Sequence, residues 1–323
     1  MNVHINRLQS APLLDPQTSA FALDALEGLT KTPKTLSPKY FYDVAGSDLF
    51  EQITLLPEYY PTRTELGILR DRGAEIAKLF PQGAALVEFG AGATTKVRLL
   101  LKRCAFKAYV PVDISGEFLH LQADALRKDF PDLAVHPVIG DFTQSFELPA
   151  AVRDMPKVGF FPGSTIGNFE PDEASRFLCR AAEILGKGAL LILGVDLEKD
   201  EQTLYDAYND AAGVTAQFNL NLLVRMNREL GANFDVSSFA HQALYSRKHH
   251  RIEMHLFSRR TQKVRLCGRT ISFAAGEGIH TENSYKYSIP RFAALARASG
   301  WRLDTSWTDV NDMFSVHALR AGG

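Results

Sequence analysis

The stretch Val-Glu-Phe-Gly-Ala-Gly-Ala-Thr-Thr-Lys, at residues 87–96, decides the fold of this chain. An apolar run from residue 84 leads into it, and a helix-compatible run over residues 95–102 follows it. A strand, a glycine turn and a helix N-terminus in this order bind nucleotide-like ligands, because the free amides of the first helical turn attract polar and anionic groups. The sequence therefore predicts the first βα unit of an α/β domain at this point.

The spacing of the glycines narrows the kind of ligand. A dinucleotide fingerprint has a third glycine three positions after the second, where the helix packs closely against the strand. Thr95 occupies that position, and Glu88 stands two residues before Gly90. An acidic residue before Gly-x-Gly without the third glycine favours S-adenosylmethionine over a dinucleotide.

Length and composition exclude several classes of protein. The 323 residues are 46% apolar and 23% charged with a formal net charge of −1, which is ordinary for a globular protein and gives no global attraction to nucleic acid or anionic lipid. The three cysteines are far apart and the nine histidines have no paired ligand spacing, so we expect neither disulfides nor a metal. The chain has no signal-peptide pattern and no apolar run of about 18 residues. We expect a monomeric, cytoplasmic protein that binds neither nucleic acid nor a membrane.

Short apolar runs alternate with amphipathic segments from residue 84 onward. The expected strands are 84–89, 108–113, 134–139, 157–161 and 189–196. The expected helices are 96–103, 116–129, an irregular one near 144–153, and 172–185. Alternating βα units predict a parallel, doubly wound sheet with helices on both faces, and ligands of such sheets bind beyond the carboxyl ends of the strands.

The alternation stops after residue 196. Residues 203–230 are predicted to be mostly helical with a break at 209–213, and antiparallel strands are expected at 252–258, 262–266 and 270–274. A helix at 291–298 and strands at 302–309 and 314–319 are expected to close the first sheet with an antiparallel edge. We therefore predict a Rossmann-like domain of residues 61–196 and 287–323, and a substrate-binding domain of residues 1–60 and 197–286.

Carboxylates stand at the ends of two further strands. Asp113 ends the second strand about twenty residues after the glycine turn, where a carboxylate accepts hydrogen bonds from ribose hydroxyls. Asp141 ends the third strand and is suited to the adenine amine, and the amide of Phe142 is suited to a ring nitrogen. Each position alone is typical of a helix cap or a loop, but three strand ends in this order predict an adenosyl cofactor. Lys96 fits either an exposed helix position or a contact with the methionine carboxylate of that cofactor.

Longer motifs give the chain a family resemblance. They are FYD at 41–43, GSDLF at 46–50, LPEYYPTRTE at 56–65, GSTIGN at 163–168 and YNDAAGVT at 208–215. From about residue 36 to its end, the chain resembles the histidine-specific Nα-methyltransferases of ergothioneine biosynthesis. The resemblance implies an α/β fold with a Rossmann-like S-adenosylmethionine methyltransferase domain and an α+β substrate-binding insert domain. It also implies S-adenosyl-L-methionine as methyl donor, no metal, and transfer of three methyl groups to the α-amino nitrogen of L-histidine, giving hercynine.

The resemblance further implies roles for individual residues. The implied cofactor-binding residues are Tyr59, Gly90, Lys96, Asp113, Asp141 and Phe142. The implied substrate-binding residues are Tyr42, Gly163, Thr165, Asn168, Tyr208, Met254, Glu282 and Ser284. Of these, the candidate catalytic residues are Tyr42, Asn168 and Tyr208.

Methyl transfer explains these residue types. The reaction is an in-line displacement that needs mainly a neutral amine and an electrophilic methyl group in near-attack geometry. Asn168 and Tyr208 are expected to bind the substrate carboxylate without taking the proton of the amine. Glu282 and Ser284 are expected to bind the imidazole, with Glu282 favouring a charged ring. The face of Tyr42 is expected to attract the quaternary ammonium.

The sequence disfavours three other functions. A related N-methyltransferase for another amino acid or an aromatic amine such as tryptophan would be expected to replace Glu282 and enlarge the site at Met254, and this chain has neither change. A non-catalytic S-adenosylmethionine-binding protein would be expected to lose Asn168, Tyr208 or Glu282, and all three are present. Residues 163–165 lack the Gly-x-Ser-x-Gly spacing of a serine hydrolase.

Overall fold

The computed structural model describes residues 19–322, which fall into two compact units. The first unit comprises residues 19–41, 216–242 and 255–282, and the second comprises residues 42–215, 243–254 and 283–322. The domain bounds predicted from the sequence, with breaks after residues 60, 196 and 286, stay a prediction. Among the described residues, no helix has both the length and the apolar character that a membrane span requires.

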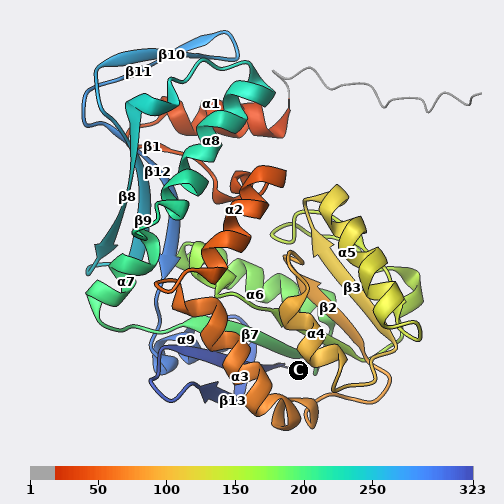
Figure 1. Ribbon diagram of the computed structural model, residues 1–323. Coiled ribbons are helices and arrows are strands. Elements are labelled where there is room, and N and C mark those ends of the chain that lie inside the picture. The colour runs from red at the N-terminus through yellow and green to blue at the C-terminus, as the bar shows by residue number, and fades with distance from the viewer. Residues whose placement is uncertain (1–18, 323) are drawn as a thin grey trace, which may run out of the picture. The chain divides into compact units, whose positions relative to one another are not determined.

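The second unit is built on an eight-stranded sheet (Figure 1). The strand order is β13-β14-β7-β6-β2-β3-β4, and β5 also pairs with β3. The strands are β2 (Ala85–Phe89), β3 (Ala108–Asp113), β4 (Ala134–Val135), β5 (Val138–Ile139), β6 (Lys157–Phe161), β7 (Leu190–Asp196), β13 (Trp301–Thr308) and β14 (Phe314–Ala321). The pairs from β7 to β4 are parallel, whereas β14 is antiparallel to both β7 and β13. The predicted α/β sheet and its antiparallel edge are confirmed.

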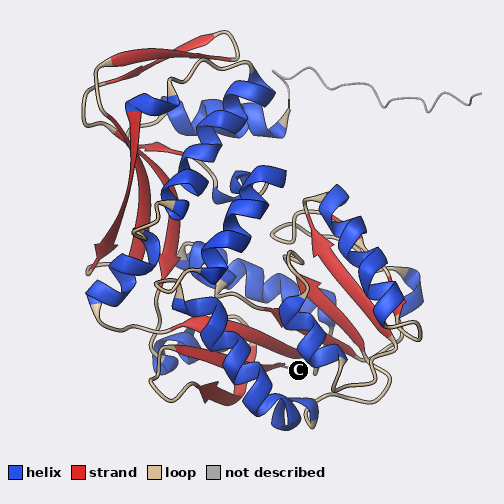
Figure 2. Cartoon of the chain, viewed as in Figure 1, coloured by secondary structure: helices blue, strands red, loops and turns tan. Residues whose placement is uncertain are grey.

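Helices lie on both faces of this sheet (Figure 2). One face is covered by α3 (Tyr60–Ala77), α4 (Thr95–Leu101) and α5 (Gly116–Asp129), and the other by α6 (Pro171–Leu185) and α9 (Ile289–Ala298). Successive side chains of β2 alternate between the two cores, with Leu86 in the first and Val87 and Phe89 in the second. Because both faces of each central strand are buried, these strands are continuous apolar runs, which is why the sequence predicted them well.

The remaining elements include a second, four-stranded sheet of order β1-β12-β9-β8 and a two-stranded antiparallel hairpin β10-β11. The strands are β1 (Lys34–Thr35), β8 (Phe239–Ser246), β9 (Arg251–Ser258), β10 (Gln262–Leu266), β11 (Arg269–Phe273) and β12 (Gly278–Tyr285). The helices are α1 (Ala20–Thr30), α2 (Val44–Leu55), α7 (Glu201–Tyr208) and α8 (Val214–Leu230), so the predicted break at 209–213 is confirmed.

The structure differs from the expected elements at several places. Residues 134–139 form two short strands rather than one, and residues 144–153 contain only a 3-10 helix, Ala150–Val152. The strands β8 and β12 were not expected. The reason is clear in β12, where the polar residues Thr281, Glu282 and Ser284 are buried, so the strand has no apolar alternation to recognise.

Candidate active site

The glycine turn after β2 is fixed to the neighbouring strand. The backbone N–H groups of Gly90 and Ala91 both donate to the carbonyl of Val112 on β3, at 2.9 and 3.0 Å. Gly90 has a φ of +73°, a region that side-chain-bearing residues rarely adopt, and a Cβ built on it would lie 3.2 Å from Phe142 Cε1. The structure therefore brings Gly90 and Phe142 together, and a side chain at residue 90 would be strained and would crowd the Phe142 ring.

The two predicted strand-end carboxylates lie in capping positions. Asp113 Oδ1 accepts from the backbone N–H of Ser115 at 2.8 Å, and Asp141 Oδ1 accepts from the N–H of Thr143 at 2.9 Å. Burial raises the pKa of the Asp113 carboxyl, against the lowering effect of the backbone N–H of Ser115. The N–H of Gly140 donates to the carbonyl of Asp113 at 3.0 Å, so the ends of β3 and β5 are held side by side. Both carboxylates and the glycine turn thus belong to one edge of the sheet, as an adenosyl site requires.

Lys96 is held by a buried carboxylate that sequence reasoning did not single out. Its Nζ lies 2.6 Å from Glu65 Oε2, and the Glu65 side chain is only 1% exposed. Glu65 also accepts from the backbone N–H of Gly163, at 3.1 and 2.9 Å. A Cβ on Gly194 would lie 2.2 Å from Glu65 Oε1, so the glycine on β7 leaves space for this carboxylate. Glu65 is the last residue of the motif at 56–65, and this position in a family motif is the sequence feature that could have identified it.

The Glu65 carboxylate contacts both Lys96 and Gly163, which were predicted to bind two different ligands. A Cβ on Gly163 would lie 3.3 Å from Lys96 Nζ and 3.5 Å from Thr165 Oγ1. Lys96 was predicted for the cofactor, and Gly163 and Thr165 for the substrate. Their proximity is what direct transfer between two bound ligands requires.

An aromatic row connects three further predicted residues. The ring centroids of Tyr42 and Phe50 are 5.6 Å apart, those of Phe50 and Tyr59 are 6.2 Å apart, and those of Tyr59 and Tyr208 are 6.2 Å apart. All three contacts are edge-to-face. Phe50 completes the row but was not predicted as a site residue, although it lies in the motif at 46–50. Four aromatic rings in a row offer π-faces to a cation.

Tyr208, at the C-terminal end of α7, also belongs to a buried polar network. Its hydroxyl donates to Ser284 Oγ at 2.7 Å. The ammonium group of Lys286 donates to Tyr208 Oη at 3.0 Å, to Ser284 Oγ at 2.8 Å and to Asp196 Oδ2 at 2.7 Å. The Lys286 side chain is 0% exposed, and sequence reasoning missed it because an isolated lysine is ordinarily a surface residue.

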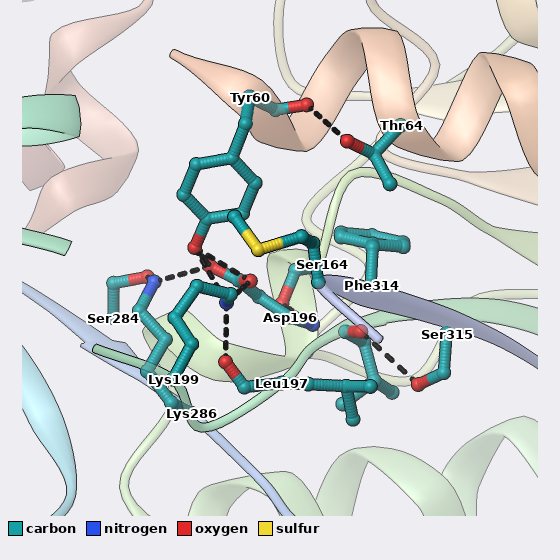
Figure 3. A network of polar contacts seen from close by, with 12 residues as sticks. Tyr60, Thr64, Ser164, Asp196, Leu197, Lys199, Ser284, Lys286, Phe314 and Ser315 are labelled. Atoms are coloured by element: carbon teal, nitrogen blue, oxygen red, sulfur yellow. Dashed lines mark hydrogen bonds and ion pairs between the residues drawn. The ribbon is translucent and has the colours of Figure 1, made fainter. Parts of the chain in front are cut away.

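Figure 3 shows how this network centres on Asp196, the last residue of β7. The Tyr60 hydroxyl donates to both oxygens of Asp196 at 2.8 Å, and Lys199 Nζ lies 2.6 Å from Asp196 Oδ1. Burial opposes ionisation of the Asp196 carboxyl, but the ammonium groups of Lys286 and Lys199 outweigh it and lower its pKa. Burial raises the pKa of Tyr60 well above its usual range, and the Asp196 charge adds to this effect. Asp196 is therefore a carboxylate and Tyr60 a neutral phenol.

Of the other predicted substrate residues, Thr165 and Asn168 lie in a 3-10 helix, and Met254 and Glu282 lie on strands. Asn168 ends a 3-10 helix, Thr165–Asn168, and Thr165 Oγ1 donates to the Pro162 carbonyl at 2.9 Å. Met254 is buried on β9 in the second unit. Glu282 is buried on β12 at the end of the first unit, and its carbonyl oxygen lies 3.1 Å from His280 Nε2.

The chain as a whole matches one family of enzymes. Residues 21–321 match the model of the histidine-specific methyltransferases, which are described as SAM-dependent. The chain belongs to this family. Its methyl donor is accordingly S-adenosylmethionine, and the predicted α/β fold, cofactor and family resemblance are confirmed.

Members of known activity align with nearly the full chain. The histidine N-alpha-methyltransferase of Mycolicibacterium smegmatis is 43% identical over 310 residues, covering 94% of this chain and 95% of that protein. The histidine N-alpha-methyltransferase of Mycobacterium tuberculosis is 42% identical over 304 residues, covering 92% and 94%. Ergothioneine biosynthesis protein 1 of Neurospora crassa is 30% identical over 307 residues, which cover 89% of this chain but 33% of that longer protein.

Proposed function

We propose that this methyltransferase transfers three methyl groups from S-adenosylmethionine to the α-amino nitrogen of L-histidine, giving hercynine for ergothioneine biosynthesis. One observation carries the proposal beyond family membership. At Tyr208, a row of aromatic rings suited to a cation meets a buried hydroxyl and ammonium network suited to an anion. A trimethylated α-amino acid carries these two charges on adjacent atoms, the ammonium nitrogen and the carboxylate being joined through the α-carbon.

We propose that the cofactor binds at the carboxyl ends of the central strands. Gly90 and Phe142 lie together at this edge of the sheet, and both are proposed to contact the adenosyl group. Asp113 and Asp141 are proposed to accept from the ribose and the adenine, Lys96 to meet the methionine carboxylate, and Tyr59 to contact the cofactor from the aromatic row. When bound, S-adenosylmethionine supplies an electrophilic methyl group on a sulfonium.

We propose that the substrate histidine is held at its carboxylate and at its imidazole. Asn168 and Tyr208 are proposed to bind the carboxylate, and Glu282 and Ser284 the imidazole, with Met254 at the wall of the imidazole site. Tyr42, with Gly163 and Thr165 beside it, is proposed to lie near the amine. These residues would hold the amine close to the methyl group that the cofactor supplies, and such positioning lowers the barrier of a displacement reaction.

Repeated transfer requires the site to accept a growing cation. Each methylation adds bulk and, at the third, a permanent positive charge. The rings of Tyr42, Phe50 and Tyr59 are suited to this product, because cation–π attraction does not need an N–H donor. The alternative substrate, tryptophan or another aromatic amine, would leave the carboxylate of Glu282 without an imidazole N–H.

The test is to incubate the purified enzyme with S-adenosylmethionine and a panel of amino acids and amines, and to identify the products by mass spectrometry. We expect trimethylhistidine, with negligible transfer to tryptophan. Absence of any histidine product would refute the substrate assignment. A reaction that stops at monomethylhistidine with donor in excess would refute the trimethylation while leaving the substrate intact.

A further inference from the structure

Three ionised side chains share the carboxyl end of β7. They are Asp196, Lys199 and Lys286, whose side chains are 1%, 7% and 0% exposed. Two ammonium groups and one carboxylate leave this cluster with one excess positive charge. Its other hydrogen-bond partners are neutral, namely the hydroxyls of Tyr60, Tyr208 and Ser284 and the carbonyl of Leu197.

A further carboxylate, that of Asp309, acts on Lys199 rather than on Lys286. Asp309 is partly exposed, and it accepts the backbone N–H groups of Asn311, Met313 and Phe314 at 2.7–3.0 Å. Both ammonium groups share the Asp196 carboxylate, and burying more positive than negative charge is costly. A ligand that brings a negative charge close to this cluster therefore binds more favourably.

The positive charge of Lys286 affects the proposed substrate-binding hydroxyl of Tyr208 through a hydrogen bond. Lys286 Nζ donates to Tyr208 Oη at 3.0 Å, and the Tyr208 hydroxyl hydrogen points to Ser284 Oγ. An ammonium that donates to a phenol oxygen draws electron density from its O–H bond and makes the phenol a stronger donor. If the Tyr208 hydrogen turns to a ligand, Ser284 Oγ still accepts from Lys286 at 2.8 Å. Tyr208 can therefore exchange partners without leaving a buried group unpaired.

We propose that Lys286 is a positioning residue that makes Tyr208 select substrates with a free α-carboxylate. This inference rests on the proposed function, in which Tyr208 binds the substrate carboxylate. The substrate class is then the zwitterionic α-amino acid, and the enzyme discriminates against the corresponding amides, esters and decarboxylated amines. Lys286 acts through Tyr208 and not by direct contact with the substrate.

The experiment compares L-histidine with L-histidinamide, which differ at the carboxylate, by calorimetry on the intact enzyme with S-adenosylhomocysteine present. Lys286→Met keeps the length of the side chain and removes its charge. We expect it to weaken L-histidine binding by about 10- to 100-fold, the range for a lost charged hydrogen bond, and to change L-histidinamide binding by less than twofold. Equal weakening of both ligands would overturn the proposal, because a purely structural lysine would not distinguish them.

Lys199→Met is the matched control. It removes a neighbouring ammonium from the same carboxylate, but Lys199 contacts Tyr60 and not Tyr208. We expect a loss of L-histidine affinity several-fold smaller than that of Lys286→Met. Equal losses in the two variants would show that net charge alone matters, and would overturn the route through Tyr208.

The wild-type enzyme gives a test that does not depend on a variant folding. If it binds L-histidinamide as tightly as L-histidine, the proposal is wrong whatever Lys286→Met does. If the enzyme methylates a different amino acid, the proposed function fails, and the same comparison with that amino acid and its amide still tests Lys286.

Discussion

Glu88, two positions before Gly90, allows a quantitative test of how burial affects a carboxyl group beside the glycine turn. Its side chain is buried at the end of β2 and accepts a hydrogen bond from the Tyr109 hydroxyl. Burial raises the pKa of the Glu88 carboxyl from 4.5 to about 8, although the Tyr109 hydroxyl and the Lys96 ammonium act to lower it. The folded protein therefore holds a proton on Glu88 at neutral pH that the unfolded chain releases.

The sign of the stability effect follows from that difference. Between pH 4.5 and about 8 the folded state binds more protons than the unfolded state, so the free energy of unfolding falls as the pH rises. The contribution is fully present below pH 4.5 and is lost as the pH rises through about 8. The slope is about 1.4 kcal/mol per pH unit, which amounts to roughly 4 kcal/mol between pH 5 and pH 8.

Glu88→Gln isolates this effect. Glutamine is nearly isosteric and accepts from Tyr109, but it does not titrate. We expect denaturant unfolding between pH 5 and pH 8 to show that the free energy of unfolding of the variant, relative to that of the wild type, rises by about 1.4 kcal/mol per pH unit. Glu183→Gln, on the exposed face of α6, is the control and should give a constant difference. A constant difference for Glu88→Gln as well would refute the argument, because Glu88 would then be ionised throughout.

Three further predictions address the ligands. Gly90→Ala places a Cβ 3.2 Å from Phe142 at a φ of +73°; we expect a loss of roughly 1–2 kcal/mol of stability and weaker S-adenosylmethionine binding, and unchanged melting and affinity would contradict this. Phe50→Leu removes the ring between Tyr42 and Tyr59; mass spectrometry should show the third methylation slowed more than the first, and an unaltered product distribution would count against the aromatic row. Glu282→Ala should weaken histidine binding by about 1.5–3 kcal/mol and leave cofactor affinity unchanged by calorimetry; equal losses would remove Glu282 from the substrate site.

The parts of the fold that the sequence predicts are those in which burial follows a simple period. The expected strands at 108–113 and 157–161 and the helix at 116–129 have the bounds of β3, β6 and α5. The buried central strands are apolar throughout, and α5 places Leu119, Ala123 and Leu126 on one face. Strand β12 does not follow this period, because it buries the polar residues Thr281, Glu282 and Ser284.

The site itself is only partly visible in the sequence. Motifs at strand ends predict Gly90, Asp113 and Asp141 as cofactor-binding residues, because the topology of a parallel sheet brings strand ends together. Glu65 and Lys286 could not be assigned, since a charged residue gains its role only from partners far away in the chain. Lys286 lies 90 positions from Asp196, and Glu65 lies 98 positions from Gly163. No periodicity or spacing records contacts of that range.

The motif at 208–215 acquires a physical meaning from its own hydrogen bonds. The Asn209 side chain donates to the Ala243 carbonyl at 3.1 Å and accepts from the Ala243 N–H at 3.0 Å, which ties the end of α7 to β8. The Asp210 carboxylate accepts from the backbone N–H groups of Val214 and Thr215, both at 2.8 Å, and so caps the start of α8. Most of this motif therefore holds the backbone on both sides of the helix break, and its effect is to fix Tyr208. In our proposal the Tyr208 hydroxyl exchanges Ser284 for the substrate carboxylate. Such an exchange requires a fixed backbone, because an error of about 1 Å in position weakens both bonds.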